Sequence, residues 1–82
     1  MKQFPLLVFS IDRELFAGEA SALTVPGTEG QLQILVDHAP LISLLQEGEL
    51  RIRTSQGKEE KLPIGGGVVE VTPQQVVALV SF

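Results

Sequence analysis

Residues that favour turns recur along the whole sequence and divide it into short segments. These residues are Gly18, Pro26, Gly27, Gly30, Pro40, Gly48, Gly57, Gly65, Gly66, Gly67 and Pro73. The segments between them run to about 5–8 residues, a length that suits β-strands and is short for helices. This spacing predicts an all-β fold, either a two-sheet antiparallel sandwich or a barrel, with little or no helix.

The chain has 82 residues, which is one domain, and we find no repeat or linker that would divide 1–82. In "LRIRT" the aliphatic residues share one face of a strand and the arginines the other. In "VVEV" the valines at 69 and 71 oppose Glu70. "SQGK" at 55–58 is predicted to be a hairpin loop, and "TPQQ" at 72–75 a second turn.

Other segments are apolar on both faces, which an antiparallel sheet open to water normally is not. In "LLVFSI" we expect Leu7, Phe9 and Ile11 to face the core. We expect the alternate residues of these strands to face outward, and each outward group contains one serine. The groups are Leu6, Val8 and Ser10 in "LLVFSI", and Leu41, Ser43 and Leu45 in "LISLL". Little chain remains to form a covering layer, so a partner surface is the favoured explanation. Ordinary isolated exposed apolar residues are the alternative.

The motif "VDHAP" holds the only histidine, His38, beside Asp37. Adjacent residues in a turn do not readily adopt the geometry in which an acid braces an imidazole for catalysis. One histidine with scattered acids is also a weak metal site. The run Gly65–Gly67 precedes a strand and not a helix, so it predicts a close backbone approach and not a phosphate loop. We therefore predict no enzyme activity, cofactor or metal.

Charge and composition exclude further classes. The formal net charge is −4, which disfavours nucleic acid as a partner. No apolar run approaches the length of a membrane span, and no signal peptide is expected. A module that binds small molecules or carbohydrate remains the alternative. The four Phe with no Trp or Tyr count against it, because such sites usually present aromatic platforms.

The order of motifs adds a resemblance. "VPGTEGQLQILVDHAPL" resembles the signature of the ε subunit of F-type ATP synthases, which is called δ in mitochondria. The preceding "FAGEASALTVPG" and the following "GELRIRTSQGKEEKLPIGGGVVEVTPQQVVALV" resemble that family in order, so the likeness covers essentially the whole chain.

The resemblance implies a sandwich of two five-stranded sheets, about ten short strands in all, that belongs to the rotor. It also implies that this sandwich is docked to the γ subunit and rests on the c-ring. It implies a coupling role without chemistry, on the cytoplasmic face of a bacterial inner membrane or the equivalent organellar face, with no insertion into the membrane. The γ-facing residues it implies are Ser10, His38, Ser43 and Glu70. The loop implied to face the c-ring is Thr28, Glu29, Gly30 and Gln31.

The sequence departs from the family in three respects. Val36 stands where the family usually has Pro, and Gln31 stands where an acid is common. The family usually continues into a helical hairpin that can inhibit hydrolysis and in some members binds ATP, whereas this sequence stops at Phe82. It is either a short member or part of a longer chain, and we expect these 82 residues to bind no ATP.

Overall fold

The computed structural model describes residues 2–37 and 39–82, and over these residues it contains strands and turns but no helix. The eight strands are β1 (Phe4–Phe9), β2 (Glu14–Gly27), β3 (Gly30–Leu35), β4 (Leu41–Leu45), β5 (Gly48–Thr54), β6 (Glu59–Ile64), β7 (Gly66–Val71) and β8 (Val76–Ser81). The predicted all-β sandwich is confirmed. The described residues form eight strands where about ten were expected.

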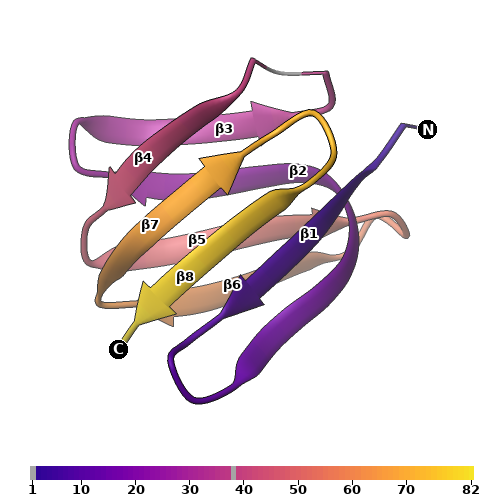
Figure 1. Ribbon diagram of the computed structural model, residues 1–82. Helices are drawn as coiled ribbons and strands as arrows, with labels where there is room; N and C mark the ends of the chain where they lie inside the picture. The colour runs from indigo at the N-terminus through magenta and orange to yellow at the C-terminus, as the bar shows by residue number, and fades with distance from the viewer. Residues whose placement is uncertain (1, 38) are drawn as a thin grey trace.

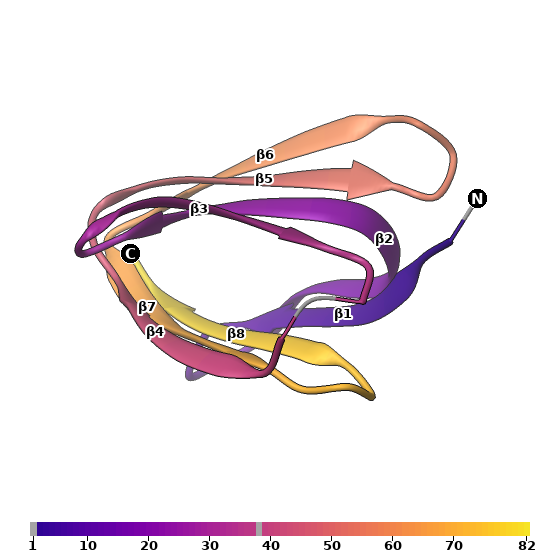
Figure 2. The same cartoon turned by 90° about the horizontal axis from the view of Figure 1, so that it is seen from above.

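The strands form two layers that face each other (Figures 1 and 2). One layer runs β4-β7-β8-β1, and the other contains β3, the second half of β2, β5 and β6. One pair departs from the antiparallel prediction, because β1 and β8 run parallel to each other. These two strands come from opposite ends of the sequence, so their pairing closes the domain.

The long strand β2 joins the two layers. Its first half pairs with β1, and its second half pairs with β5 and β3. The β2–β5 register shifts between Ala20 and Ala22, and irregularities of this kind bend a strand and increase its twist. Because one bent strand serves both layers, the sandwich needs fewer strands than two separate sheets would.

The core lies between the layers and is aliphatic. Its largest fully buried side chains are Leu23, Leu50, Ile52, Val8, Val25, Val69, Val71 and Val76. The predicted alternation is confirmed in β5, where the arginines are exposed, and in β7, where Glu70 is exposed. Both predicted turns also join the expected strands, with Gly57 in the left-handed region at φ 83°.

The predicted facing of β1 is wrong. Leu6 and Val8 are buried, and Ser10 beyond them is 6% exposed, whereas Ile11 is 99% exposed. The reason is that β1 lies between β8 and β2, and its register places Leu6 and Val8 beside the buried Val76 and Ala78 of β8. The same error affects β4, where Leu45 is buried and Ile42 and Leu44 face outward.

Candidate functional site

The outer surface of the layer β4-β7-β8-β1 carries two rows of side chains, which we call the open face. Strand pairing aligns Leu44, Val68, Leu79 and Phe9 in one row, and Ile42, Glu70, Val77 and Leu7 in the other. Ile42 is 70% exposed, Leu44 64% and Leu79 40%, and the other apolar members are half-buried. Seven of these eight side chains are apolar, which is unusual for a sheet face in water. Contiguous exposed apolar surface of this kind marks a site of protein interaction.

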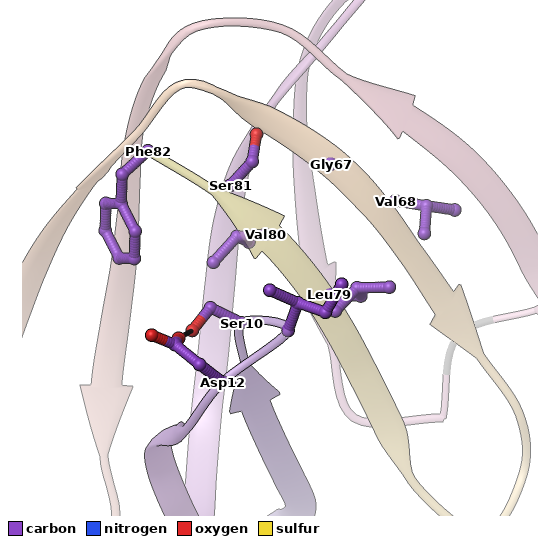
Figure 3. Close-up of a pocket in the computed structure, with 9 residues that line it drawn as sticks. Ser10, Asp12, Gly67, Val68, Leu79, Val80, Ser81 and Phe82 are labelled. Atoms are coloured by element: carbon purple, nitrogen blue, oxygen red, sulfur yellow. Dashed lines mark hydrogen bonds between the residues drawn. The ribbon is translucent and has the colours of Figure 1, made fainter.

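A shallow groove of about 460 Å³ adjoins the open face where β8 ends; we call it the terminal groove. Its lining residues are Ser10, Ile11, Asp12, Gly67, Val68, Leu79, Val80, Ser81 and Phe82. Figure 3 shows Phe82 beyond the end of β8, on the same side of the groove as the turn that holds Ser10 and Asp12. The lining is mainly apolar, so the terminal groove extends the open face by a recess that a large apolar side chain would fit.

Ser10 fixes the turn that borders the terminal groove. Its backbone N–H donates to the Arg13 carbonyl at 2.8 Å, and its hydroxyl donates to Asp12 Oδ1 at 2.7 Å (Figure 3). This hydroxyl, followed by the backbone N–H of Asp12 itself, lowers the pKa of the Asp12 carboxyl below its ordinary value. Ser10 was predicted to face γ directly. Ser10 is 6% exposed and holds the turn that presents Ile11 to solvent, and its contact with γ stays a prediction.

Ser43 does not lie on the open face either. It is half-buried on the inward side of β4, the side of the buried Leu45, and its hydroxyl lies 3.3 Å from the Leu44 carbonyl oxygen. The exposed neighbours Ile42 and Leu44 occupy the place that was predicted for it. Of the predicted γ-facing residues, Glu70 is the one whose exposed side chain is in the open face itself.

The predicted c-ring-facing residues form an exposed tip. Thr28 and Glu29 make the two-residue turn between β2 and β3, and Gly30 follows at φ 129°, where glycine is favoured. The Thr28 N–H donates to the Leu44 carbonyl at 3.0 Å. The tip is therefore anchored to β4, and a load applied at Glu29 would pass directly into the layer that carries the open face.

His38, the remaining predicted interface residue, lies outside the described residues. Its neighbour Asp37 has φ 65°, a left-handed conformation that marks a tight turn at this position. Asp37 forms an exposed ion pair with Lys2, in which Lys2 Nζ donates to Asp37 Oδ2 at 3.3 Å. Over residues 2–37 and 39–82, no three metal-ligating side chains come together, and no helix is long and apolar enough to cross a membrane.

Sequence reasoning did not identify the apolar residues that line the open face and the terminal groove. These are the half-buried Phe9 and the exposed Ile11, Ile42, Leu44, Leu79 and Phe82. It detected strands that were apolar on both faces and then assigned the wrong face outward. The serines were used as the sign of an outer face, and both serines point inward. No residue-level signal in "LLVFSI" or "LISLL" distinguishes the two sets, because the choice depends on pairing with distant strands.

The fold and the open face together define a class: a small β-sandwich module whose largest functional feature is an uncovered apolar sheet face, a surface suited to assembly. The profile of the ATP synthase Delta/Epsilon chain β-sandwich domain matches residues 3–81. The chain therefore belongs to the family of ATP synthase delta/epsilon chains, and the resemblance seen in its motifs is confirmed.

Known relatives agree with this assignment. The chain is 47% identical over 72 residues to the ATP synthase epsilon chain of Psychrobacter arcticus, which covers 88% of this chain and 52% of the relative. It is 41% identical over 76 residues to the epsilon chain of Dichelobacter nodosus, covering 93% and 53%. The chain thus spans about half the length of the curated relatives it matches.

Solved structures share the fold at lower identity. A chain of the Euglena gracilis mitochondrial ATP synthase, in a structure of OSCP, F1 and c-ring, matches with a TM-score of 0.90 at 24% identity, covering 98% of this chain and 51% of that one. A chain of the Tetrahymena thermophila mitochondrial enzyme, in a structure of central stalk and c-ring, matches with a TM-score of 0.82 at 18% identity, covering 99% and 65%.

Proposed function

We propose that this chain is a rotor module of the central stalk of an F-type ATP synthase. In this role the open face docks onto the γ subunit, and the tip at Thr28–Gln31 meets the polar loops of the c-ring. The domain performs no chemistry; it fixes γ to the ring so that torque from ion flow reaches the catalytic head. The observation that carries the proposal is the open face: an apolar sheet surface that no other described part of this chain covers, in a chain of the ATP synthase delta/epsilon family.

The geometry of the domain supports two separate contacts, one with γ through the open face and one with the c-ring through the tip. The open face lies on the layer β4-β7-β8-β1 and the exposed tip joins two strands of the other layer, and the backbone bond from Thr28 to Leu44 connects the tip to β4. A rigid sheet between two contacts transmits torque without needing a moving part. The proposed location follows from the assembly: peripheral, at the cytoplasmic face of a bacterial inner membrane or the equivalent organellar face.

Ile42→Glu tests the docking face. Ile42 is 70% exposed, so a charge there leaves folding nearly intact but places a carboxylate against an apolar partner. We expect affinity for purified γ, measured by calorimetry, to fall by at least about tenfold. Gln33→Glu is the matched control, because Gln33 is exposed on β3 in the opposite layer. If Ile42→Glu binds γ as the parent does, the open face is not the docking surface.

The small-molecule or carbohydrate alternative is not favoured. The terminal groove offers Phe82 as its only aromatic ring among the described residues, and its polar groups lie at one edge. A sugar site needs aromatic platforms with several convergent polar groups. The family assignment points in the same direction, since its members are chains of ATP synthase.

A further inference from the structure

Glu70 is the one charged side chain in the two rows of the open face. Strand pairing places Ile42 beside it on β4 and Val77 beside it on β8. Val68, two residues earlier on the same strand, faces the same way. Within residues 2–37 and 39–82, Glu70 makes no ion pair and no side-chain hydrogen bond. It is exposed, so water solvates its carboxylate in the isolated chain.

Covering the open face would remove that water. A carboxylate transferred into an apolar interface without a partner is strongly unfavourable, so buried charges in proteins are paired. Glu70 has an apolar neighbour on each adjacent strand, Ile42 on β4 and Val77 on β8, so it is not at the end of its row. A partner that covers this face must therefore replace the water that solvates the Glu70 carboxylate with a group that binds it.

Among residues 2–37 and 39–82, no lysine or arginine lies in the two rows of the open face. Four of its six basic residues lie on or beside the β5–β6 hairpin of the opposite layer: Arg51, Arg53, Lys58 and Lys61. Lys2 pairs with Asp37, and Arg13 follows the turn at Asp12. The described residues therefore supply no counter-charge for Glu70, and a covering partner is the source that we consider.

We infer that the partner on the open face presents a lysine or arginine side chain to Glu70, within an otherwise apolar contact surface. The inference rests on the proposed function and specifies its partner: the docking surface of γ carries one basic residue that sits between Ile42 and Val77 when the two subunits meet. The apolar rows supply contact area, and the single ion pair fixes the register of one surface on the other. A shifted register would leave both charges buried and unpaired, which is how one charge pair gives specificity.

Glu70→Gln is the direct test, since it keeps the size and shape of the side chain and removes only the charge. Truncating one member of a buried charge pair costs enough to weaken binding by at least about 30-fold. We expect that loss in affinity for purified γ, measured by calorimetry. Glu59→Gln is the matched control, because Glu59 is exposed on β6 in the opposite layer and should bind like the parent.

Reversing the charge of Glu70 makes the test more specific for an ion pair. Glu70→Lys should weaken binding more than Glu70→Gln, and replacing the facing basic residue of γ by Glu should restore part of the affinity. Unfolding midpoints of the variants should match the parent, since Glu70 is exposed in the free chain. Failure of every basic-to-acidic replacement in γ to rescue Glu70→Lys would overturn the inference.

The outcomes separate this inference from the proposed function. If Ile42→Glu destroys γ binding but Glu70→Gln binds as tightly as the parent, then γ docks here and contributes no cation, and the inference is wrong. If both variants bind normally, the proposed docking face itself is wrong. Loss of binding by both, with normal binding by the two controls, supports both statements.

Discussion

Gly67 in β7 lies directly against the backbone of Leu79 in β8. A Cβ at position 67 would collide with the Leu79 carbonyl oxygen and would lie 2.9 Å from the Cα of Val80. Gly67 also has φ 152°, a conformation that residues with side chains rarely adopt. Gly67 therefore allows β7 and β8 to approach closely, as the sequence predicted.

Gly67→Ala should consequently destabilise the domain. Backbone strain and the collision with β8 together should lower the free energy of unfolding by about 2–4 kcal/mol. Denaturant titration followed by circular dichroism measures this change. Gly18→Ala is the control, because a Cβ there meets only the Phe16 ring at an ordinary contact distance of 3.6 Å. Equal stability of the two variants would contradict the close-approach explanation.

The Ser10–Asp12 bond should be visible in a pH titration. The pKa of Asp12 is lowered in the folded chain by the Ser10 hydroxyl, so the bond stabilises the fold where Asp12 is ionised in both states. That contribution is complete above about pH 5 and is lost as pH falls through the lowered pKa. Ser10→Ala should raise the pKa of Asp12 toward 3.8, measured by NMR.

The control for that titration is Ser43→Ala, whose hydroxyl contacts only the Leu44 carbonyl. It should leave the pKa of Asp12 unchanged. The difference in unfolding free energy between Ser10→Ala and the parent should also shrink between pH 7 and about pH 2. A difference that stays constant over this range would show that Ser10 acts by packing and not through Asp12.

Several features could be predicted from the sequence because a local pattern of residue types was enough to determine them. In β5 and β7 charged residues alternate with aliphatic residues, so the pattern itself shows which side of the strand faces solvent. Turns at 55–58 and 72–75 were marked by their residue types; at the second, the Thr72 hydroxyl accepts the Gln75 N–H at 3.1 Å. The family resemblance rested on ordered motifs and covered the whole domain.

The facing of β1 and β4 could not be predicted by the same means. Both strands are apolar on both sides, and a register shift of one residue would exchange core and surface with no change in local hydrophobicity. The choice is made by contacts distant in sequence: β1 is set by its parallel pairing with β8, and β4 by its pairing with β7. The bend that lets β2 serve both layers is likewise a tertiary effect.

His38 lies outside the described residues, so its role at the interface stays a prediction. We expect His38→Ala to weaken γ binding by about 1 kcal/mol, the net contribution of a typical hydrogen bond. Asp37→Asn is the control, because Asn also tolerates the left-handed backbone at φ 65° and removes only the neighbouring charge. Turnover of fully assembled complexes should be unchanged by His38→Ala. A complete loss of turnover there would assign His38 a chemical role.

We predict finally that these 82 residues bind no ATP and exert no brake on hydrolysis. In the terminal groove, the charged side chain of the lining is the carboxylate of Asp12, which repels phosphate. Phosphate sites in proteins use basic side chains or the N-terminus of a helix. The basic cluster on the β5–β6 hairpin is on the opposite layer and alternates with Glu59 and Glu60.

Two measurements check this prediction. Calorimetry with millimolar ATP should show no binding heat for the 82-residue chain, and its unfolding midpoint should not rise with nucleotide, because a ligand stabilises only a fold that binds it. Complexes rebuilt with this chain should hydrolyse ATP without the inhibition that we expect when a helical hairpin is attached to it. Binding heat that disappears in a variant with a charged replacement at Leu79 would instead place a nucleotide site in the groove, and inhibition by the 82 residues alone would show that the sandwich itself regulates hydrolysis.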